Sequence, residues 1–228
     1  MKHWYKIVLS LFIIAGLFYS QSINAAGKEN FPILILGEAG HFDTYTGEML
    51  KTEGFNEFQI KSITNNNLSL KYLQKFDLII LTHTTLTDQQ KEAFALYVKE
   101  GGNLLAFSPD EKLAPVFGIK NKTGTLSEAY ISISPFSDIG KGLITTTLQI
   151  HSSADMYLSD GGKTIASLYK SATDSTNYPA AVINNYGLGH AIAFMYDLPK
   201  SIAYTRQGNP LFAGQEKDSI KGIRAMDL

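Results

Sequence analysis

Two uninterrupted apolar runs constrain the fold of this chain more than any other feature. Residues 32–37 (PILILG) and 76–82 (FDLIILT) contain almost no polar side chain, and each ends in glycine or a small polar residue. Short apolar runs of this kind are typical of parallel strands that are buried on both faces of a sheet. Residues 58–63 and 103–107 are two further runs that we expect to be strands of the same sheet.

Helix-forming segments separate these four runs. Residues 44–54, 68–75 and 112–117 favour short helices, and residues 87–101 give the strongest helix pattern. There Thr87 is a good N-cap, Gln90 stands at the capping-box position, and a pair of glycines ends the helix. Alternating strands and helices with short connections predict an α/β fold with a parallel sheet and right-handed crossovers.

The second half of the chain has a different pattern. Short β-like runs at residues 129–134, 148–151, 164–169, 180–184 and 191–196 are separated by turn residues, and residues 186–189 (YGLG) favour a hairpin turn. Residues 199–228 are polar, contain glycine and lack periodicity. We therefore expect a β-rich C-terminal half followed by an irregular polar tail or interdomain linker.

The N-terminus resembles a targeting segment. Lys2 and Lys6 precede an apolar run from Ile7 to Phe18, and small residues follow up to Ala26. This order predicts a secretory signal peptide over residues 1–26 and export to the periplasm or the extracellular space. An uncleaved membrane anchor is the alternative, but the run is shorter than the ~20 residues that a membrane span needs. Residues 27–198 would then form one domain.

Composition excludes several classes of function. The net charge is −1, and removal of residues 1–26 would take away two lysines and no acidic residue, so a basic face for nucleic acid is not expected. The sequence has no cysteine, which rules out a disulfide framework. No motif for a cofactor is present, and no paired spacing of histidine with glutamate signals a metal site, so we expect neither. The only tryptophan is Trp4, so a sugar-stacking surface would have to use tyrosine or phenylalanine.

Several segments together resemble a known superfamily. Residues 76–82 (FDLIILT), 86–94 (LTDQQKEAF) and 97–107 (YVKEGGNLLAF) are similar to class I glutamine-amidotransferase-like domains, and residues 113–119 and 178–194 are similar to their following helix and late hairpin. The non-amidotransferase branches are nearest: the ThuA-like proteins and the middle domain of family 42 β-galactosidases. The resemblance covers about residues 31–198 and implies a flavodoxin-like parallel sheet with flanking helices. Because it is a likeness of fold, function inferred from it is analogy.

One departure from that superfamily affects its chemistry. Its amidotransferases use a cysteine on a sharp strand-to-helix turn, with histidine and glutamate later in the chain, and this sequence has no cysteine. Ser108 is nearest by order, but it lacks the flanking glycines of a nucleophile elbow. Where many ThuA-like proteins have a histidine near the end of the late hairpin, this chain reads Phe194-Met195-Tyr196-Asp197. We therefore expect no glutaminase activity.

Candidate site residues follow the predicted strands, because ligands of open α/β sheets bind beyond the carboxyl ends of the strands. Glu38, His41 and Asp43 follow the first strand, and His83 follows the third. They could carry acid–base chemistry, or they could be solvated loop residues with Asp43 or Thr44 capping the next helix. In the tail, Arg206 and Glu216 could bind a polar ligand and cover this edge of the sheet, or could belong to a loose segment.

Three functional hypotheses follow. The first is an exported, non-catalytic accessory or interaction module linked to carbohydrate processing. The second is a hydrolase acting on a sugar-related substrate, and the third is the N-terminal part of a larger enzyme. Expected partners are a carbohydrate or small polar ligand and a following domain or second copy of the chain, with no nucleic acid and no membrane after signal cleavage.

Overall fold

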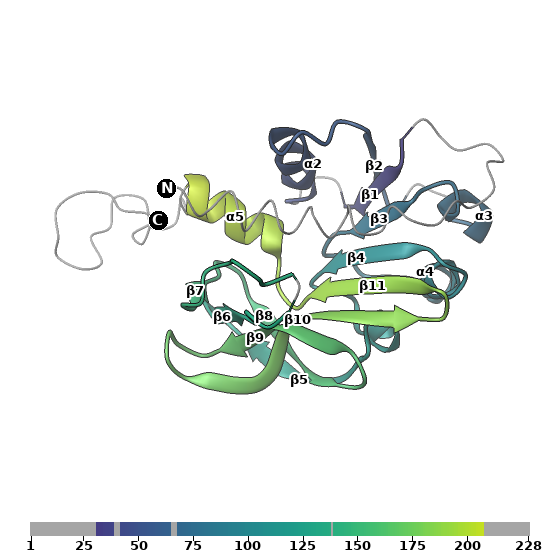
Figure 1. Cartoon of the computed structure of the whole chain (residues 1–228). Coiled ribbons are helices and arrows are strands. Elements are labelled where there is room, and N and C mark those ends of the chain that lie inside the picture. Colours follow the sequence, from purple (N-terminus) through teal and green to yellow (C-terminus); the bar gives the residue numbers. More distant parts are fainter. Residues whose placement is uncertain (1–30, 39–41, 65–67, 138, 208–228) are drawn as a thin grey trace.

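The computed structural model describes residues 31–38, 42–64, 68–137 and 139–207. Its strands form one large mixed sheet and one small two-stranded sheet, with helices on both sides of the parallel half (Figure 1). The helices are α2 (Asp43–Thr52), α3 (Leu70–Leu73), the 3-10 helix η1 (Glu111–Phe117), α4 (Asp88–Lys99) and α5 (Leu198–Gln207). The strands are β1 (Ile33–Gly37), β2 (Phe58–Ser62), β3 (Leu78–Leu81), β4 (Asn103–Phe107), β5 (Ile119–Leu126), β6 (Tyr130–Ile133), β7 (Leu148–Gln149), β8 (Ala154–Ser159), β9 (Lys163–Tyr169), β10 (Ser175–Tyr186) and β11 (Gly189–Phe194).

The predicted parallel sheet is confirmed. Within the described ranges the large sheet has the order β2-β1-β3-β4-β11-β10-β9-β6-β7, and the four predicted strands β2, β1, β3 and β4 are neighbours in parallel pairing. β11 extends this half, because it also pairs parallel to β4. The remaining strands are antiparallel and form the β-rich half that the turn-separated runs indicated.

The large sheet separates two apolar clusters, which explains why its central strands contain so few polar residues. On β1, Leu34 and Leu36 point into one cluster, and Ile33 and Ile35 point into the other. The first cluster is covered by α3, α4 and η1, whereas the second contains Leu50 of α2. A strand with apolar contacts on both faces cannot alternate polar and apolar residues.

Helix α4 shows how local sequence sets an element boundary. The Thr87 hydroxyl accepts a hydrogen bond from the backbone N–H of Gln90, and the Gln90 side chain accepts one from the backbone N–H of Thr87. This is the predicted capping box, and the helix ends before Gly101, whose φ of 108° requires a glycine.

Two features of the fold were not predicted. The small sheet pairs β5 with β8 antiparallel, and neither strand has the regular alternation by which strands are identified. Four successive residues of β5, Lys120 to Thr123, are exposed, and Asn121 at φ 46° lies where the pairing is irregular. The second feature is α5: the segment expected to be irregular from residue 199 is helical as far as Gln207, and residues 208–228 lie outside the described residues.

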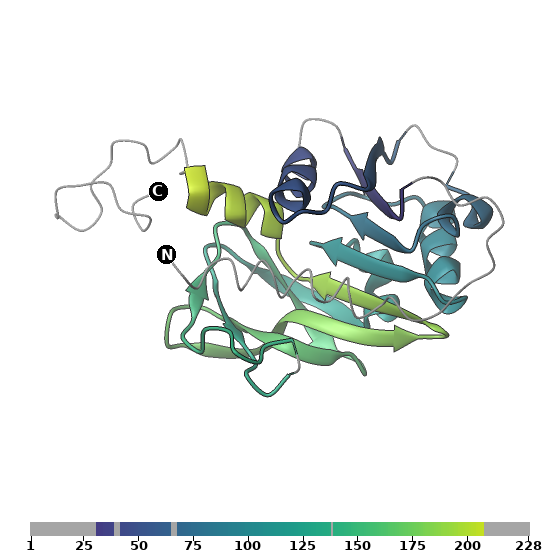
Figure 2. The ribbon, with the colours of Figure 1, turned by 45° about the horizontal axis from the view of Figure 1, so that its top comes forward.

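Helix α5 follows directly after β11 and lies against α2 (Figures 1 and 2). It is tied to the β-rich half through Ser201, whose hydroxyl contacts that of Ser152 at 3.2 Å. Inside the described ranges, no helix is long and apolar enough to cross a membrane.

Candidate functional site

The carboxyl ends of β1, β3, β4 and β11 meet at one edge of the sheet, because all four strands run in parallel. Glu38 directly follows β1, and its Oε1 accepts a hydrogen bond of 2.9 Å from the hydroxyl of Thr84 in the loop after β3. The loops after the first and third strands therefore adjoin, as the predicted strand order required. His83 precedes Thr84 and is exposed, whereas Thr84 is buried.

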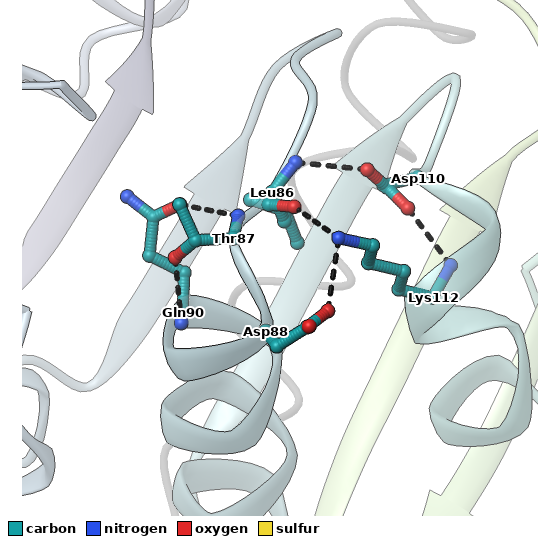
Figure 3. A network of polar contacts seen from close by, with 6 residues as sticks. All are labelled: Leu86, Thr87, Asp88, Gln90, Asp110 and Lys112. Atoms are coloured by element: carbon teal, nitrogen blue, oxygen red, sulfur yellow. Dashed lines mark hydrogen bonds and ion pairs between the residues drawn. The ribbon is translucent and has the colours of Figure 1, made fainter.

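A polar network joins the loops after β3 and β4 (Figure 3). Asp110 accepts a hydrogen bond from the backbone N–H of Leu86 with one carboxylate oxygen and from that of Lys112 with the other, both at 2.8 Å. The Lys112 ammonium in turn donates to the Leu86 carbonyl at 2.8 Å and forms an ion pair with Asp88 at 2.9 Å. Both Asp110 oxygens thus hold backbone groups, so this carboxylate caps η1 and fixes the loop.

Lys112 also favours the ionised form of Asp88. A hydrogen bond from the Lys112 ammonium, and then its positive charge, lower the pKa of the Asp88 carboxyl below its ordinary value. Asp88 lies in the first turn of α4, where a negative charge also suits the helix dipole. The network therefore has a complete structural explanation as a link between two loops.

Ser108 occupies a strained turn immediately after β4. Its φ is 44°, a left-handed conformation that is uncommon for serine, and its backbone N–H donates to the Phe194 carbonyl at 2.8 Å. The neighbouring strand continues into Met195 and Tyr196, which are both buried. A phenol is protonated at neutral pH, and burial raises the pKa of the Tyr196 phenol further, so Tyr196 offers no general base.

An aromatic–lysine cluster, defined here as Phe42, Tyr45, Lys200 and Tyr204, joins α2 to α5. The Phe42 ring stacks on Tyr45 at 5.6 Å between centroids and meets Tyr204 edge-on at 5.6 Å. The Lys200 ammonium lies 5.9 Å from the Phe42 centroid and 5.5 Å from that of Tyr204. All four side chains are partly exposed.

Sequence reasoning placed Arg206 at this edge and missed the cluster. Arg206 is exposed on α5, but it lies two residues beyond Tyr204 and so about 200° around the helix axis from it. Lys200 and Tyr204 are one turn apart and share the face that contacts Phe42. That spacing of four residues is the signal in the sequence that indicates a shared helical face.

The other candidate residues are placed as follows. Asp43 is the first residue of α2, and Phe42 occupies the N-cap position without a side-chain cap hydrogen bond. His41 and Glu216 lie outside the described residues. Among the residues that are described, no three histidine, aspartate or glutamate side chains gather as a metal site would require. Convergence of Glu38, His41, Asp43 and His83 with Arg206 and Glu216 stays a prediction.

Compared by sequence, the chain matches no protein-family model and no curated protein. Solved structures nevertheless share its fold. A β-galactosidase from Rahnella sp. R3 aligns with a TM-score of 0.57 and 15% identity over 78% of this chain and 32% of that chain. A protein from Bacteroides uniformis described as ThuA-like aligns with a TM-score of 0.57 and 14% identity over 78% of this chain and 86% of that one.

A cytoplasmic protein from Salmonella typhimurium also aligns, with a TM-score of 0.54 and 16% identity over 73% of this chain and 88% of that one. The present chain thus spans about a third of the β-galactosidase and most of the two smaller proteins. At these identities the likeness shows a shared fold. The shared fold agrees with the flavodoxin-like α/β sheet expected from the sequence, and a β-galactosidase and an exo-β-1,4-mannosidase are among the proteins that contain it.

Proposed function

We propose that this protein is an exported, non-catalytic module of carbohydrate processing, built on the amidotransferase-like fold. One observation carries the proposal: the fold matches a part of β-galactosidases that makes up about a third of those chains, and it also matches a ThuA-like protein along most of its length. A fold that occurs both inside glycoside hydrolases and as a separate protein suits a domain that supports or binds carbohydrate.

The non-catalytic part of the proposal is supported by the turn after β4. An acyl-transfer site needs a nucleophile and a base within hydrogen-bond reach. Ser108 is nearest by order to the cysteine of the superfamily's amidotransferases, and the adjacent end of β11 supplies a thioether and a buried phenol, from Met195 and Tyr196. Asp110, the nearest carboxylate in sequence, is occupied by two backbone N–H groups.

Export is proposed from the sequence of residues 1–26. Their charged start, apolar run and small-residue end are typical of a secretory signal peptide. N-terminal sequencing of protein from the periplasm or culture medium tests this directly. A mature start near Ala26 supports export, whereas material that starts at Met1 contradicts it.

A hydrolase is the second candidate, and the contact between Glu38 and Thr84 favours it. This hydrogen bond holds a carboxylate at the sheet edge, where ligands of open α/β sheets bind. His41, Asp43 and His83 would complete the acid–base set. Glycoside cleavage needs two carboxylates roughly 5–10 Å apart.

A two-part experiment distinguishes these functions. The purified protein is applied to a glycan panel and, in parallel, incubated with chromogenic glycosides and with glutamine. We expect binding of at least one glycan, no glycoside cleavage and no ammonia release. Cleavage that is abolished by Glu38→Gln and retained by the surface variant Glu92→Gln would establish the hydrolase instead. Absence of binding to any glycan would refute the proposed module.

A further inference from the structure

The aromatic–lysine cluster leaves apolar rings and a cation exposed at the surface of the α2–α5 contact. If Phe42, Tyr45 and Tyr204 served only to pack α5 against α2, their rings would be expected to be buried, as the paired rings of Phe194 and Tyr196 are. Instead all three rings remain partly exposed. Aromatic rings that are apolar on their faces and accessible at their edges are typical of surfaces that bind ligands.

The position of the cluster is also that of a binding site. Phe42 stands at the N-terminus of α2, in the connection that leaves the carboxyl end of β1. Tyr204 and Lys200 come from α5, which follows the carboxyl end of the parallel strand β11. The cluster therefore gathers side chains from two connections at the same edge of the sheet, where ligands of open α/β sheets bind.

Lys200 defines the charge of the ligand. Among the described side chains its ammonium contacts the Phe42 and Tyr204 rings and forms no ion pair. An ammonium held above aromatic rings is ready to pair with an incoming carboxylate, and charge-assisted hydrogen bonds of this kind are stronger than neutral ones.

We propose that the aromatic–lysine cluster is a binding subsite for a sugar ring that carries a carboxylate, such as a hexuronic acid. The apolar C–H face of the sugar stacks on the Tyr204 ring, the Phe42 ring at 86° to it contacts the edge of the sugar, and the carboxylate of the sugar pairs with Lys200. This inference rests on the proposed carbohydrate-related function and adds to it the class of sugar and the residues that recognise it.

Calorimetric titration with two matched probes tests the inference. The probes are a trimer of galacturonic acid and a neutral trimer of galactose, each added to the purified protein and to three variants. Lys200→Gln should weaken binding of the acidic trimer on the order of tenfold and leave any binding of the neutral trimer unchanged. Tyr204→Ala should weaken binding of both. Lys75→Gln is the matched control, because Lys75 also lies over an aromatic ring, that of Tyr72 on α3, and should change nothing.

A second measurement covers the case in which Tyr204→Ala fails to fold. In protein labelled with 3-fluorotyrosine, the fluorine resonances of Tyr45 and Tyr204 should shift when the acidic trimer is added, and Tyr→Phe variants assign them. Binding that survives both Lys200→Gln and Tyr204→Ala, or a preference for the neutral trimer, overturns the subsite and leaves the proposed function intact. Failure of both trimers to bind also overturns the subsite, and the glycan panel then decides whether the proposed function fails with it.

Discussion

The Tyr97 hydroxyl bridges two backbone groups at the amino ends of β3 and β4, and its removal should destabilise the protein measurably. The side chain is 2% exposed, its hydroxyl donates to the Phe76 carbonyl at 3.1 Å, and it accepts from the Asn103 N–H at 3.3 Å. Tyr97→Phe keeps the ring in the core but leaves two backbone groups without this partner. An unsatisfied buried polar group costs about 1–3 kcal/mol, so we expect a loss of that size in the free energy of unfolding.

Urea denaturation of the wild type and Tyr97→Phe measures this loss. The midpoint should fall while the slope with denaturant stays the same, because the surface exposed on unfolding does not change. Thermal unfolding should show a fall of ~2–4 °C for each kcal/mol lost in a protein of this size. The control is Tyr169→Phe, which removes a hydroxyl from a partly exposed side chain on β9 of the large sheet. A loss below about 0.5 kcal/mol, the range of ordinary surface substitutions, would refute the reasoning.

Three further predictions concern buried phenols and backbone geometry. Burial raises the pKa of the phenols of Tyr97, Tyr157 and Tyr196, so near the ordinary tyrosine pKa of ~10 only the unfolded chain releases these protons. The stabilisation from these phenols is therefore complete below that pH and should fall as the pH rises above it. Urea unfolding at about pH 8 and pH 11 measures this fall in the free energy of unfolding. A flat profile would contradict this. Gly189→Ala should cost ~1–3 kcal/mol or prevent folding, because the added Cβ would lie 2.2 Å from the Gly102 and Val98 carbonyl oxygens. Gly124→Ala, where the nearest atom is the flexible Met156 methyl at 2.8 Å, should be tolerated better, and equal melting temperatures for the two variants would count against the geometry. Glu128→Gly should stabilise the exposed turn after β5 by about 0.5–1 kcal/mol, because Glu128 has a φ of 51°. Asn121→Gly at φ 46° should gain less, since asparagine tolerates this conformation, and a larger gain for Asn121 would refute the explanation.

The parallel half of the fold could be predicted because its signals are local. β1 and β3 are short apolar runs buried on both faces, and Thr87 with Gln90 marks the start of α4 by a contact between residues three apart. The small sheet could not be predicted in the same way. Strand β5 is mostly polar and exposed, and its pairing with β8 is a contact between distant segments that no local pattern encodes.

The candidate site was predicted only in outline. The order of the apolar strands indicated which loops would adjoin, and the hydrogen bond from Thr84 to Glu38 agrees with that expectation. The contact of Tyr204 with Phe42 depends on the path of α5 after β11. Lys200 and Tyr204 have the spacing of one helical turn, but a single pair of residues is a short pattern and the segment around it is rich in polar residues. The amino-acid pattern of this segment is therefore too weak to predict α5.

The parallel pairing of β4 with β11 has a consequence for how the chain folds. β11 begins at Gly189 and pairs with a strand that ends at Phe107, so strands β5 to β10 are synthesised between the two partners. Until β11 arrives, β4 is an unprotected apolar edge, and such edges pair readily with other chains. A contact between segments so far apart in sequence also closes slowly. The large sheet can therefore be completed only after β11 has been synthesised, and early stops before residue 189 should yield aggregates instead of smaller soluble domains.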